Sequence, residues 1–240
     1  DGAITPKYHA DKVSWLLTYP DTYEVGLPNQ GLQILYEIIN ERPDSVAERA
    51  YAPWTDMASV LRTNKLPFFS VDTHRPAKEF DVLGFNLSAE LVYTNLLECL
   101  DLADVPIHTE KRAAEDPLVI VGGHCTYNPE PIADFIDAAV LGDGEEVVSD
   151  ITEVVSRWKN SGRSSRESIL RELATIPGVY VPYAYTPVYE KEDLICMSPR
   201  FPETPEVVDN LEPVQKESKE DNHLLMKECI INTTKLFKLH

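Results

Sequence analysis

The sequence is poor in positive charge and has no long apolar run. Both features limit the classes of protein to which it can belong. Its 22 Lys and Arg residues are outnumbered by 40 Asp and Glu residues, which gives a formal net charge of −18. So negative a chain disfavours a general nucleic-acid surface, because such a surface needs a basic face. No apolar stretch is long enough to cross a bilayer, and no secretory leader pattern opens the chain. We therefore expect a cytoplasmic protein with no membrane partner.

The cysteines are too widely spaced to form a metal- or cluster-binding motif. The four are Cys99, Cys125, Cys196 and Cys229, with no C-x-x-C pair and no group of three among them. Cys99 lies in an apolar helical pattern, so we expect it in the core, where free cysteine is common. Cys125 follows a glycine pair in a candidate ligand loop, and packing is the favoured interpretation there too.

Short apolar runs that alternate with helical patterns predict a parallel sheet. A run closed by turn residues is typical of a strand buried on both faces, and the expected strands are 13–19, 46–52, 81–87, 118–121 and 138–141. The expected helices are 31–40, 55–61, 90–103, 145–159 and one that opens at Ser164 or Ser165. In the 90–103 helix, one apolar face is formed by Leu91, Leu96, Leu97 and Leu100. This alternation implies right-handed crossovers and an α/β fold with a doubly wound parallel sheet of about five strands.

The character of the chain changes after residue 160, and we expect three segments. Residues 1–160 form the α/β domain. Residues 161–198 add a helix and then an extended, hairpin-like segment, because valine and tyrosine alternate with prolines over 179–189. Residues 199–240 form a linker rich in proline and charge, followed by a helix-compatible tail from residue 222 without a clear motif.

Glycines and polar residues at the predicted strand ends mark the carboxyl edge of the sheet as a candidate binding site. Open α/β sheets bind ligands at this edge, and glycine lets the backbone approach a ligand closely. Helices that begin there also point their amino ends at polar or anionic groups. The candidate ligand-binding residues are Tyr19, Asp21, Ser88, Gly122, Gly123, His124, Gly142, Gly144 and Glu145.

Each of these residues also has a purely structural interpretation, which we keep open. The glycine pair could only form a turn. Ser88 could cap a helix, and Asp21 could form a turn. Glu145, in a first helical turn, favours the helix dipole whatever its function, and His124 could be an ordinary surface residue. No P-loop, dinucleotide-binding or nucleophile-elbow motif is present, and we assign no catalytic or metal-binding residue.

Four motifs occur in an order that resembles a known family. They are Gly31-Leu32-Gln33-Ile34-Leu35-Tyr36, Asp81-Val82-Leu83-Gly84-Phe85 with Ser88, Val121-Gly122-Gly123-His124 with Pro129-Glu130, and Val140-Leu141-Gly142-Asp143-Gly144-Glu145-Glu146. Over roughly residues 13–195 the chain resembles the amino-terminal cobalamin-binding-type domain of radical S-adenosylmethionine (SAM) proteins. The resemblance implies a flavodoxin-like fold with a corrinoid at the carboxyl edge. It further implies that Ser88 and the Gly122-Gly123 pair line a channel for the nucleotide tail, with Gly142, Gly144 and Glu145 nearby.

Two motifs linked to this family are absent from the sequence. Asp72-Thr73-His74 is similar to the loop that supplies a cobalt ligand in some corrinoid proteins, but the matching glycine is replaced by Ala77, so we predict a surface turn. A bound cobalamin would thus lack a protein histidine on cobalt. The three-cysteine motif for a 4Fe-4S cluster is also missing. The resemblance therefore implies an accessory domain, not catalytic by itself, for a radical SAM catalytic domain that holds the cluster and SAM, normally on the same chain.

Two further functions remain as alternatives. The first is the same fold without a cofactor, serving for interaction or substrate positioning. The second is a free-standing flavodoxin-like enzyme or phosphoacceptor, which would need paired acids after the first strand and a lysine late in the sheet. Asp21 and Glu24 are present, but no lysine follows a late strand, so we rank this function last.

Overall fold

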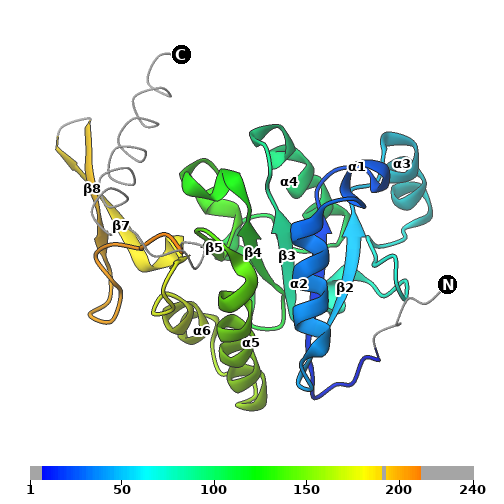
Figure 1. Ribbon diagram of the computed structural model, residues 1–240. Helices are drawn as coiled ribbons and strands as arrows, with labels where there is room; N and C mark the ends of the chain where they lie inside the picture. The colour runs from blue at the N-terminus through cyan, green and yellow to red at the C-terminus, as the bar shows by residue number, and fades with distance from the viewer. Residues whose placement is uncertain (1–6, 191–192, 212–240) are drawn as a thin grey trace.

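Six strands form one central sheet with helices on both faces (Figure 1). The computed structural model describes residues 7–190 and 193–211. The strand order is β2-β1-β3-β4-β5-β6; β1 to β5 run parallel, and β6 runs antiparallel to β5. The order 2-1-3-4-5 is that of flavodoxin-like sheets. The predicted fold class is confirmed, and the short antiparallel β6 extends the five predicted strands.

The observed elements lie close to their predicted bounds. The strands of the sheet are β1 (Val13–Tyr19), β2 (Ser45–Tyr51), β3 (Val82–Asn86), β4 (Leu118–Gly122), β5 (Ala138–Val140) and β6 (Val179–Tyr180). The helices are α1 (Tyr23–Gly26), α2 (Gln30–Glu41), α3 (Thr55–Asn64), α4 (Tyr93–Leu102), α5 (Gly144–Asn160) and α6 (Arg166–Leu173). Short 3-10 segments are Ala77–Glu79, Glu90–Val92, Thr109–Lys111, His124–Tyr127, Glu130–Phe135 and Pro182–Ala184. None of the helices in the described ranges is long and apolar enough to span a membrane.

The helix predicted over 90–103 starts differently, and the prediction that Leu91 faces the core was wrong. Glu90–Val92 form a 3-10 turn, and α4 begins only at Tyr93. Because a 3-10 turn winds more tightly than an α-helix, residues before Tyr93 do not continue the α-helical face. Leu96 and Leu100 are buried as predicted, whereas Leu91 is 88% exposed.

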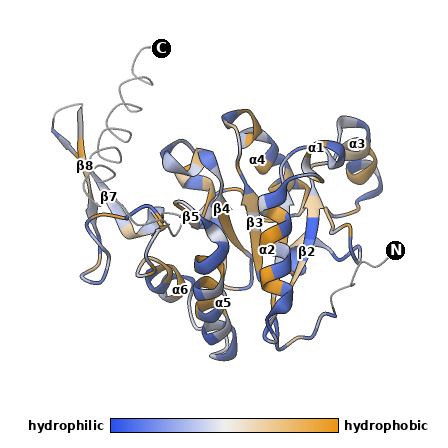
Figure 2. Cartoon of the chain, in the orientation of Figure 1, coloured by the Kyte–Doolittle hydropathy of each residue, from blue (hydrophilic) through white to orange (hydrophobic). Residues whose placement is uncertain are grey.

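Helices α2 and α5 cover one face of the sheet, and α3 and α4 cover the other (Figure 1). The hydrophobic residues concentrate in the strands and on the helix surfaces that face them (Figure 2). Because α2 follows β1 and α4 follows β3, the crossovers leave these neighbouring strands toward opposite faces. A crevice at the carboxyl ends of such strands is where doubly wound sheets bind ligands.

Trp15 fastens the sheet to α5 beneath this crevice. Its indole Nε1 donates a hydrogen bond of 3.1 Å to the buried Thr152 Oγ1. A Cβ atom added to Gly84 would lie 3.3 Å from the Leu17 side chain and 3.5 Å from the Trp15 ring. A glycine in the middle of a strand often marks such a close approach. Gly84 therefore leaves room for the indole, which lies against the adjacent strand.

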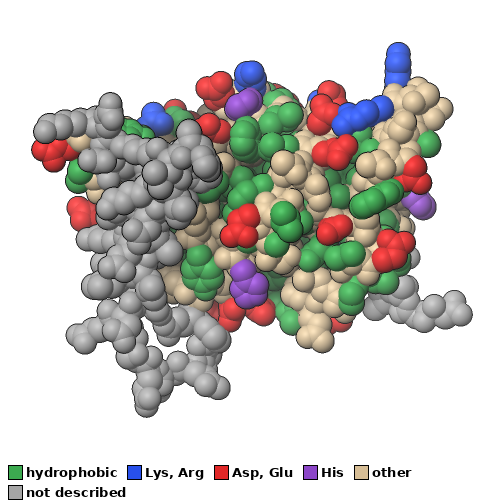
Figure 3. Space-filling view, turned by 90° about the horizontal axis from the view of Figure 1, so that it is seen from above, with side chains coloured by type: hydrophobic (Ala, Val, Ile, Leu, Met, Phe, Trp, Pro, Cys, Tyr) green, Lys and Arg blue, Asp and Glu red, His purple; other side chains and the backbone are tan. Residues whose placement is uncertain are grey.

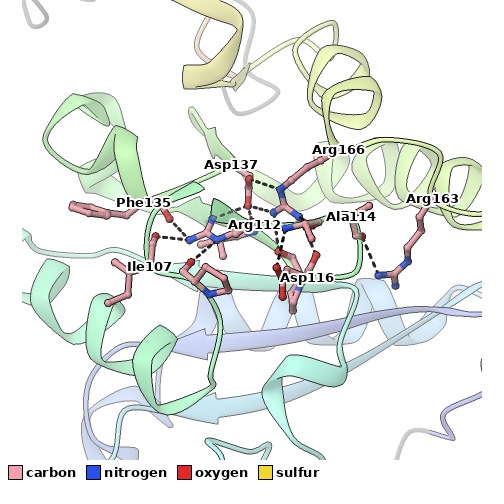
Figure 4. Close-up of polar contacts among 12 residues, drawn as sticks. Ile107, Arg112, Ala114, Asp116, Phe135, Asp137, Arg163 and Arg166 are labelled. Carbon is pink, nitrogen blue, oxygen red and sulfur yellow. Dashed lines mark hydrogen bonds and ion pairs between the residues drawn. The ribbon is translucent and has the colours of Figure 1, made fainter. Parts of the chain in front are cut away.

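Two buried aspartates fix the amino ends of the strands. Asp137, just before β5, binds two arginines: its Oδ2 accepts from Arg112 Nη1 at 2.9 Å and from Arg166 Nη2 at 2.8 Å (Figure 4). The same oxygen accepts the Val119 backbone N–H at 2.7 Å, which joins β5 to β4. Asp81, just before β3, likewise accepts from the Ser14 N–H and from Lys159 Nζ, both at 2.8 Å, and pairs with Arg163.

The chain beyond α6 first adds β6 to the sheet and then forms a separate hairpin. Strands β7 (Tyr185–Glu190) and β8 (Asp193–Pro199) pair antiparallel, in the region where the sequence predicts a hairpin-like segment. Residues 200–211, within the predicted linker, return to the sheet, and Val208 is buried against it. The predicted tail from residue 222, and Cys229, lie outside the described residues. The boundary predicted after residue 160 stays a prediction.

A partly buried acid beside β6 is expected to make the stability of the protein depend on pH. The Tyr180 hydroxyl donates to Glu130 Oε1, and burial raises the pKa of Glu130 above its ordinary value of 4.5, although this hydrogen bond opposes the shift. The folded state therefore holds the Glu130 proton more tightly than the unfolded state does. The stability that this proton contributes is present below about pH 4.5 and is lost as the pH rises through the folded-state pKa.

We expect Glu130→Gln to remove this loss, because the amide stays neutral and still accepts the Tyr180 hydroxyl. The free energy of unfolding, measured with urea, should decrease more in the wild type than in the variant as the pH is raised from about 4 to about 7. Glu110→Gln, at an exposed position of another 3-10 segment, is the control. Parallel pH profiles for the wild type and Glu130→Gln would contradict the assignment.

Candidate ligand-binding site

A cavity of about 310 Å³ opens between the carboxyl half of the sheet and helices α2 and α5. Ligand pockets usually measure about 300–1,000 Å³, so this one suits a single ring system better than a whole large cofactor. Its walls are largely apolar and include Leu17, Leu32, Leu35, Ile120, Val148 and Ile151. The cavity lies over β1, β3 and β4, at the place where the topology predicts a binding crevice.

The strand register explains why space is left there. Parallel pairing sets Leu17, Gly84 and Ile120 in one row across the sheet, and it sets Asn86 beside Gly122 in a row nearer the carboxyl edge. Alternate residues of a strand point to the same face, so both rows face α2 and α5. Trp15 and Leu17 cover the position of Gly84, whereas Gly122 leaves its part of that face open.

The four predicted glycines play different parts. A Cβ atom on Gly122 would meet nothing within 4 Å. Gly123 has φ of +104°, and its Cβ atom would lie 2.8 Å from the Leu87 carbonyl oxygen; Gly142 has φ of +102°, and its Cβ atom would lie 2.0 Å from the Leu211 carbonyl oxygen. Glycine is needed at these two positions for backbone reasons. A Cβ atom on Gly144 would lie 3.3 Å from the Leu35 side chain. Of the four glycines, Gly122 alone therefore borders open space.

The rim of the cavity is polar. It includes Asn86, His124, Tyr127, Asp143 and Glu145. Asp143 is the N-cap residue of α5, and Glu145 lies in its first turn, so two carboxylates already complement the positive end of that helix. The view onto the carboxyl edge shows hydrophobic side chains interspersed with acidic ones, with lysine and arginine near its margin (Figure 3). The rim at α5 therefore favours hydrogen-bond donors over further anions.

Asn86 links the rim to the start of α2. Its Nδ2 lies 3.4 Å from Asn29 Oδ1, which accepts the Leu32 backbone N–H at 2.8 Å and so caps α2. An Asn N-cap satisfies one of the N–H groups left free at a helix start. This contact fixes one end of α2 beside the open space at Gly122.

Three predicted site residues lie at the carboxyl edge but do not line the cavity. The Tyr19 hydroxyl and Ser88 Oγ are 2.8 Å apart and share a hydrogen bond. Asp21 Oδ1 accepts the Thr22 backbone N–H at 2.7 Å, as a turn former would. The six that do line it are Gly122, Gly123, His124, Gly142, Gly144 and Glu145. A ligand-binding role for all nine stays a prediction.

Sequence reasoning missed several residues that the structure brings to the cavity. They include Gly31, Leu35, Asn86, Tyr127 and Asp143. Asn86 carried a usable signal, because it lies two positions after Gly84 in a predicted strand, so both must face the same side. Tyr127 carried none, since the 3-10 segment His124–Tyr127 gives no periodic pattern.

The segment Asp72-Thr73-His74 forms a turn, as predicted. Asp72 pairs with Arg49 at 2.8 Å, and Thr73 Oγ1 donates to the buried Glu48 Oε2 at 2.7 Å. The exposed His74 ring packs against Phe69. These contacts tie the turn to the β2 edge of the sheet. Within residues 7–190 and 193–211, no group of three or more His, Cys, Asp or Glu side chains is placed to hold a metal ion.

Among the residues that the structure describes, two cysteines are buried. Cys99 lies in the hydrophobic core, as predicted, and burial raises the pKa of its thiol. Cys125 is buried next to the cavity region without lining it, and burial raises its pKa as well. Both thiols are therefore less readily ionised than an exposed cysteine.

Strand order and cavity together define a flavodoxin-like, doubly wound α/β domain with a ligand-sized space at its carboxyl edge. The family model described as "Radical SAM proteins, N-terminal" matches residues 31–182. The chain belongs to this family of amino-terminal regions of radical SAM proteins. No curated protein matches the chain.

Two solved structures of the radical SAM methyltransferase TsrM from Kitasatospora setae are similar to part of this chain. The one with cobalamin and a 4Fe-4S cluster bound is 15% identical, with a TM-score of 0.45, and the match covers 71% of this chain and 29% of that one. The one with tryptophan substrate and the SAM analogue aza-SAM bound is 16% identical, with a TM-score of 0.45, and the match covers 70% and 28%. The present chain thus matches less than a third of the length of either.

Proposed function

We propose that this domain binds a corrinoid and serves a radical SAM catalytic domain as an accessory unit that is not catalytic by itself. The observation that carries the proposal is the open position at Gly122, above an apolar cavity at the switch point of a flavodoxin-like sheet. Membership of the radical SAM N-terminal family and the ordered motifs around Gly122 and Gly142 support it.

The residues present fit part of such a cofactor. Gly122 and the apolar walls would hold the planar base of its nucleotide tail, because a glycine surface beside aliphatic side chains accepts a flat ring. Asn86 and His124 on the rim would hydrogen-bond the polar groups of the tail. When bound, a corrinoid supplies methyl-transfer and one-electron chemistry at cobalt, while the protein binds it and excludes water. We assign no protein ligand to the cobalt.

A second candidate is a cofactor-free domain for interaction or substrate positioning. It is favoured by large apolar side chains that are exposed to solvent just before α3 and α4. Trp54 is 66% exposed and Leu91 is 88% exposed. Exposed apolar side chains of this size are typical of surfaces that contact another protein when they form a patch.

Retention of hydroxocobalamin separates the two candidates. Purified protein is mixed with an excess of hydroxocobalamin and desalted, and its visible spectrum is then recorded. We expect corrinoid absorbance to elute with the protein in a ratio that saturates with ligand concentration. A colourless protein fraction at every ligand concentration would overturn the corrinoid proposal. The cofactor-free interaction or substrate-positioning domain would then be the remaining candidate.

A further inference from the structure

The segment Val208–Leu211, here called the C-terminal strap, lies against the loop Gly142–Gly144 at the cavity. The Leu211 N–H donates to the Leu141 carbonyl at 2.8 Å, and the Asp143 N–H donates to the Leu211 carbonyl at 3.3 Å. These two bonds make Leu211 a parallel bridge partner of Gly142. The loop that begins α5 is thus paired with a segment far away along the sequence.

The side chains of the strap hold it in place. Val208 is buried, and a Cβ atom on Gly178 would lie 2.2 Å from the Leu211 side chain, so leucine occupies the space that this glycine leaves. Asn210 Nδ2 lies 3.2 Å from the hydroxyl of Tyr127, a residue of the cavity rim. Gly142 and Gly178 both have a positive φ, which glycine adopts readily. A side chain at either position would also collide with Leu211 of the strap.

We propose that the strap is a positioning element of the cavity: it holds Gly142–Gly144 and Tyr127 at the rim. Gly142 therefore makes room for the strap, whereas Gly122 makes room for the ligand. In its ligand-binding part this inference rests on the proposed function. By linkage, a ligand in the cavity and the docked strap stabilise each other, so displacing the strap weakens binding and a bound ligand tightens the strap.

Hydrogen exchange tests the positioning role without any cofactor. In Leu211→Ala and Asn210→Ala, the amide of Asp143 should exchange at least about tenfold faster than in the wild type, because its acceptor is held less firmly. Amides of β1, such as that of Leu17, and the urea midpoint should change little. Leu211→Met should restore slow exchange at Asp143, and Leu91→Ala, at an exposed position, is the control. Unchanged exchange at Asp143 in both strap variants would overturn the proposal.

Dissociation of hydroxocobalamin tests the coupling. We expect both strap variants to release the corrinoid roughly tenfold faster than the wild type, within the range usual for coupled sites. The bound corrinoid should also slow exchange at Asp143 in the wild type. Equal release rates from the wild type and from strap variants with fast exchange would refute the coupling. If the wild type retains no corrinoid, the proposed function fails, while the exchange result still decides the role of the strap.

Discussion

Replacing Gly122 with phenylalanine is expected to abolish corrinoid retention in a protein that stays folded. The new side chain has room, because a Cβ atom at this position meets nothing within 4 Å, and it would extend into the apolar cavity. It would occupy the volume that we assign to the nucleotide tail. We expect affinity to fall by at least about 100-fold, which corresponds to about 2.7 kcal/mol. Equilibrium dialysis against hydroxocobalamin measures it, with circular dichroism to confirm the fold.

Two further variants separate loss of space from loss of structure. Gly122→Ala adds one methyl group to open space and should retain most of the affinity. Gly123→Ala should lower the stability for two reasons. The backbone at residue 123 has φ of +104°, which alanine rarely adopts, and the new Cβ atom would lie 2.8 Å from the Leu87 carbonyl oxygen. Full affinity in Gly122→Phe would show that the ligand does not use this cavity.

Removing the carboxylate of Asp137 is expected to give the largest loss of stability. Asp137→Ala leaves the Arg112 guanidinium, whose side chain is fully buried, without its charged partner. It also removes the acceptor of the Val119 N–H that joins β5 to β4. Breaking a buried ion pair by deleting one partner costs about 3–5 kcal/mol. Small domains are stable by only about 5–15 kcal/mol, so urea unfolding should show a much lower midpoint.

The conservative variant and an exposed neighbour test the cause. Asp137→Asn keeps one acceptor oxygen and should lose less stability than Asp137→Ala, which also gives a measurable protein if the alanine variant does not fold. Asp134→Ala, at an exposed position of the preceding 3-10 segment, should stay within about 0.5 kcal/mol of the wild type. A loss below about 1 kcal/mol in Asp137→Ala would show that backbone carbonyls and solvent accept the hydrogen bonds that Asp137 otherwise receives from Arg112, Arg166 and the Val119 N–H.

The order of strands and helices could be predicted because most of the buried strands are apolar runs closed by glycine or a polar turn. Val13–Tyr19 and Leu118–Val121 are such runs, and both became strands close to their predicted bounds. Val179–Tyr180 was predicted only as part of an extended segment over 179–189, and its pairing with β5 could not be predicted from two residues. Leu91 was misplaced because periodicity does not distinguish an α-helical start from a 3-10 turn.

The cavity was harder to predict, because it depends on register and on distant contacts. Gly122 and Gly142 look alike in the sequence, since each directly follows an apolar run. Their difference arises from Leu211, which fills the space at Gly142 and leaves Gly122 open. No local pattern links residue 142 to residue 211. The strand pattern could place Asn86 on the same face as Gly84, but its pairing with Gly122 of the neighbouring strand β4 needs the structure.

The two buried aspartates at the amino ends of β3 and β5 have a consequence for how this domain can change over evolution. Asp81 and Asp137 hold the sheet together at the edge opposite the cavity. Substitutions around the cavity mouth, at His124 or Tyr127, therefore leave that anchorage intact. Apart from Gly123 and Gly142, the cavity rim is free to diversify toward new ligands, while the opposite edge tolerates little change. Random mutagenesis should find accepted substitutions clustered at one edge of the sheet and depleted at the other.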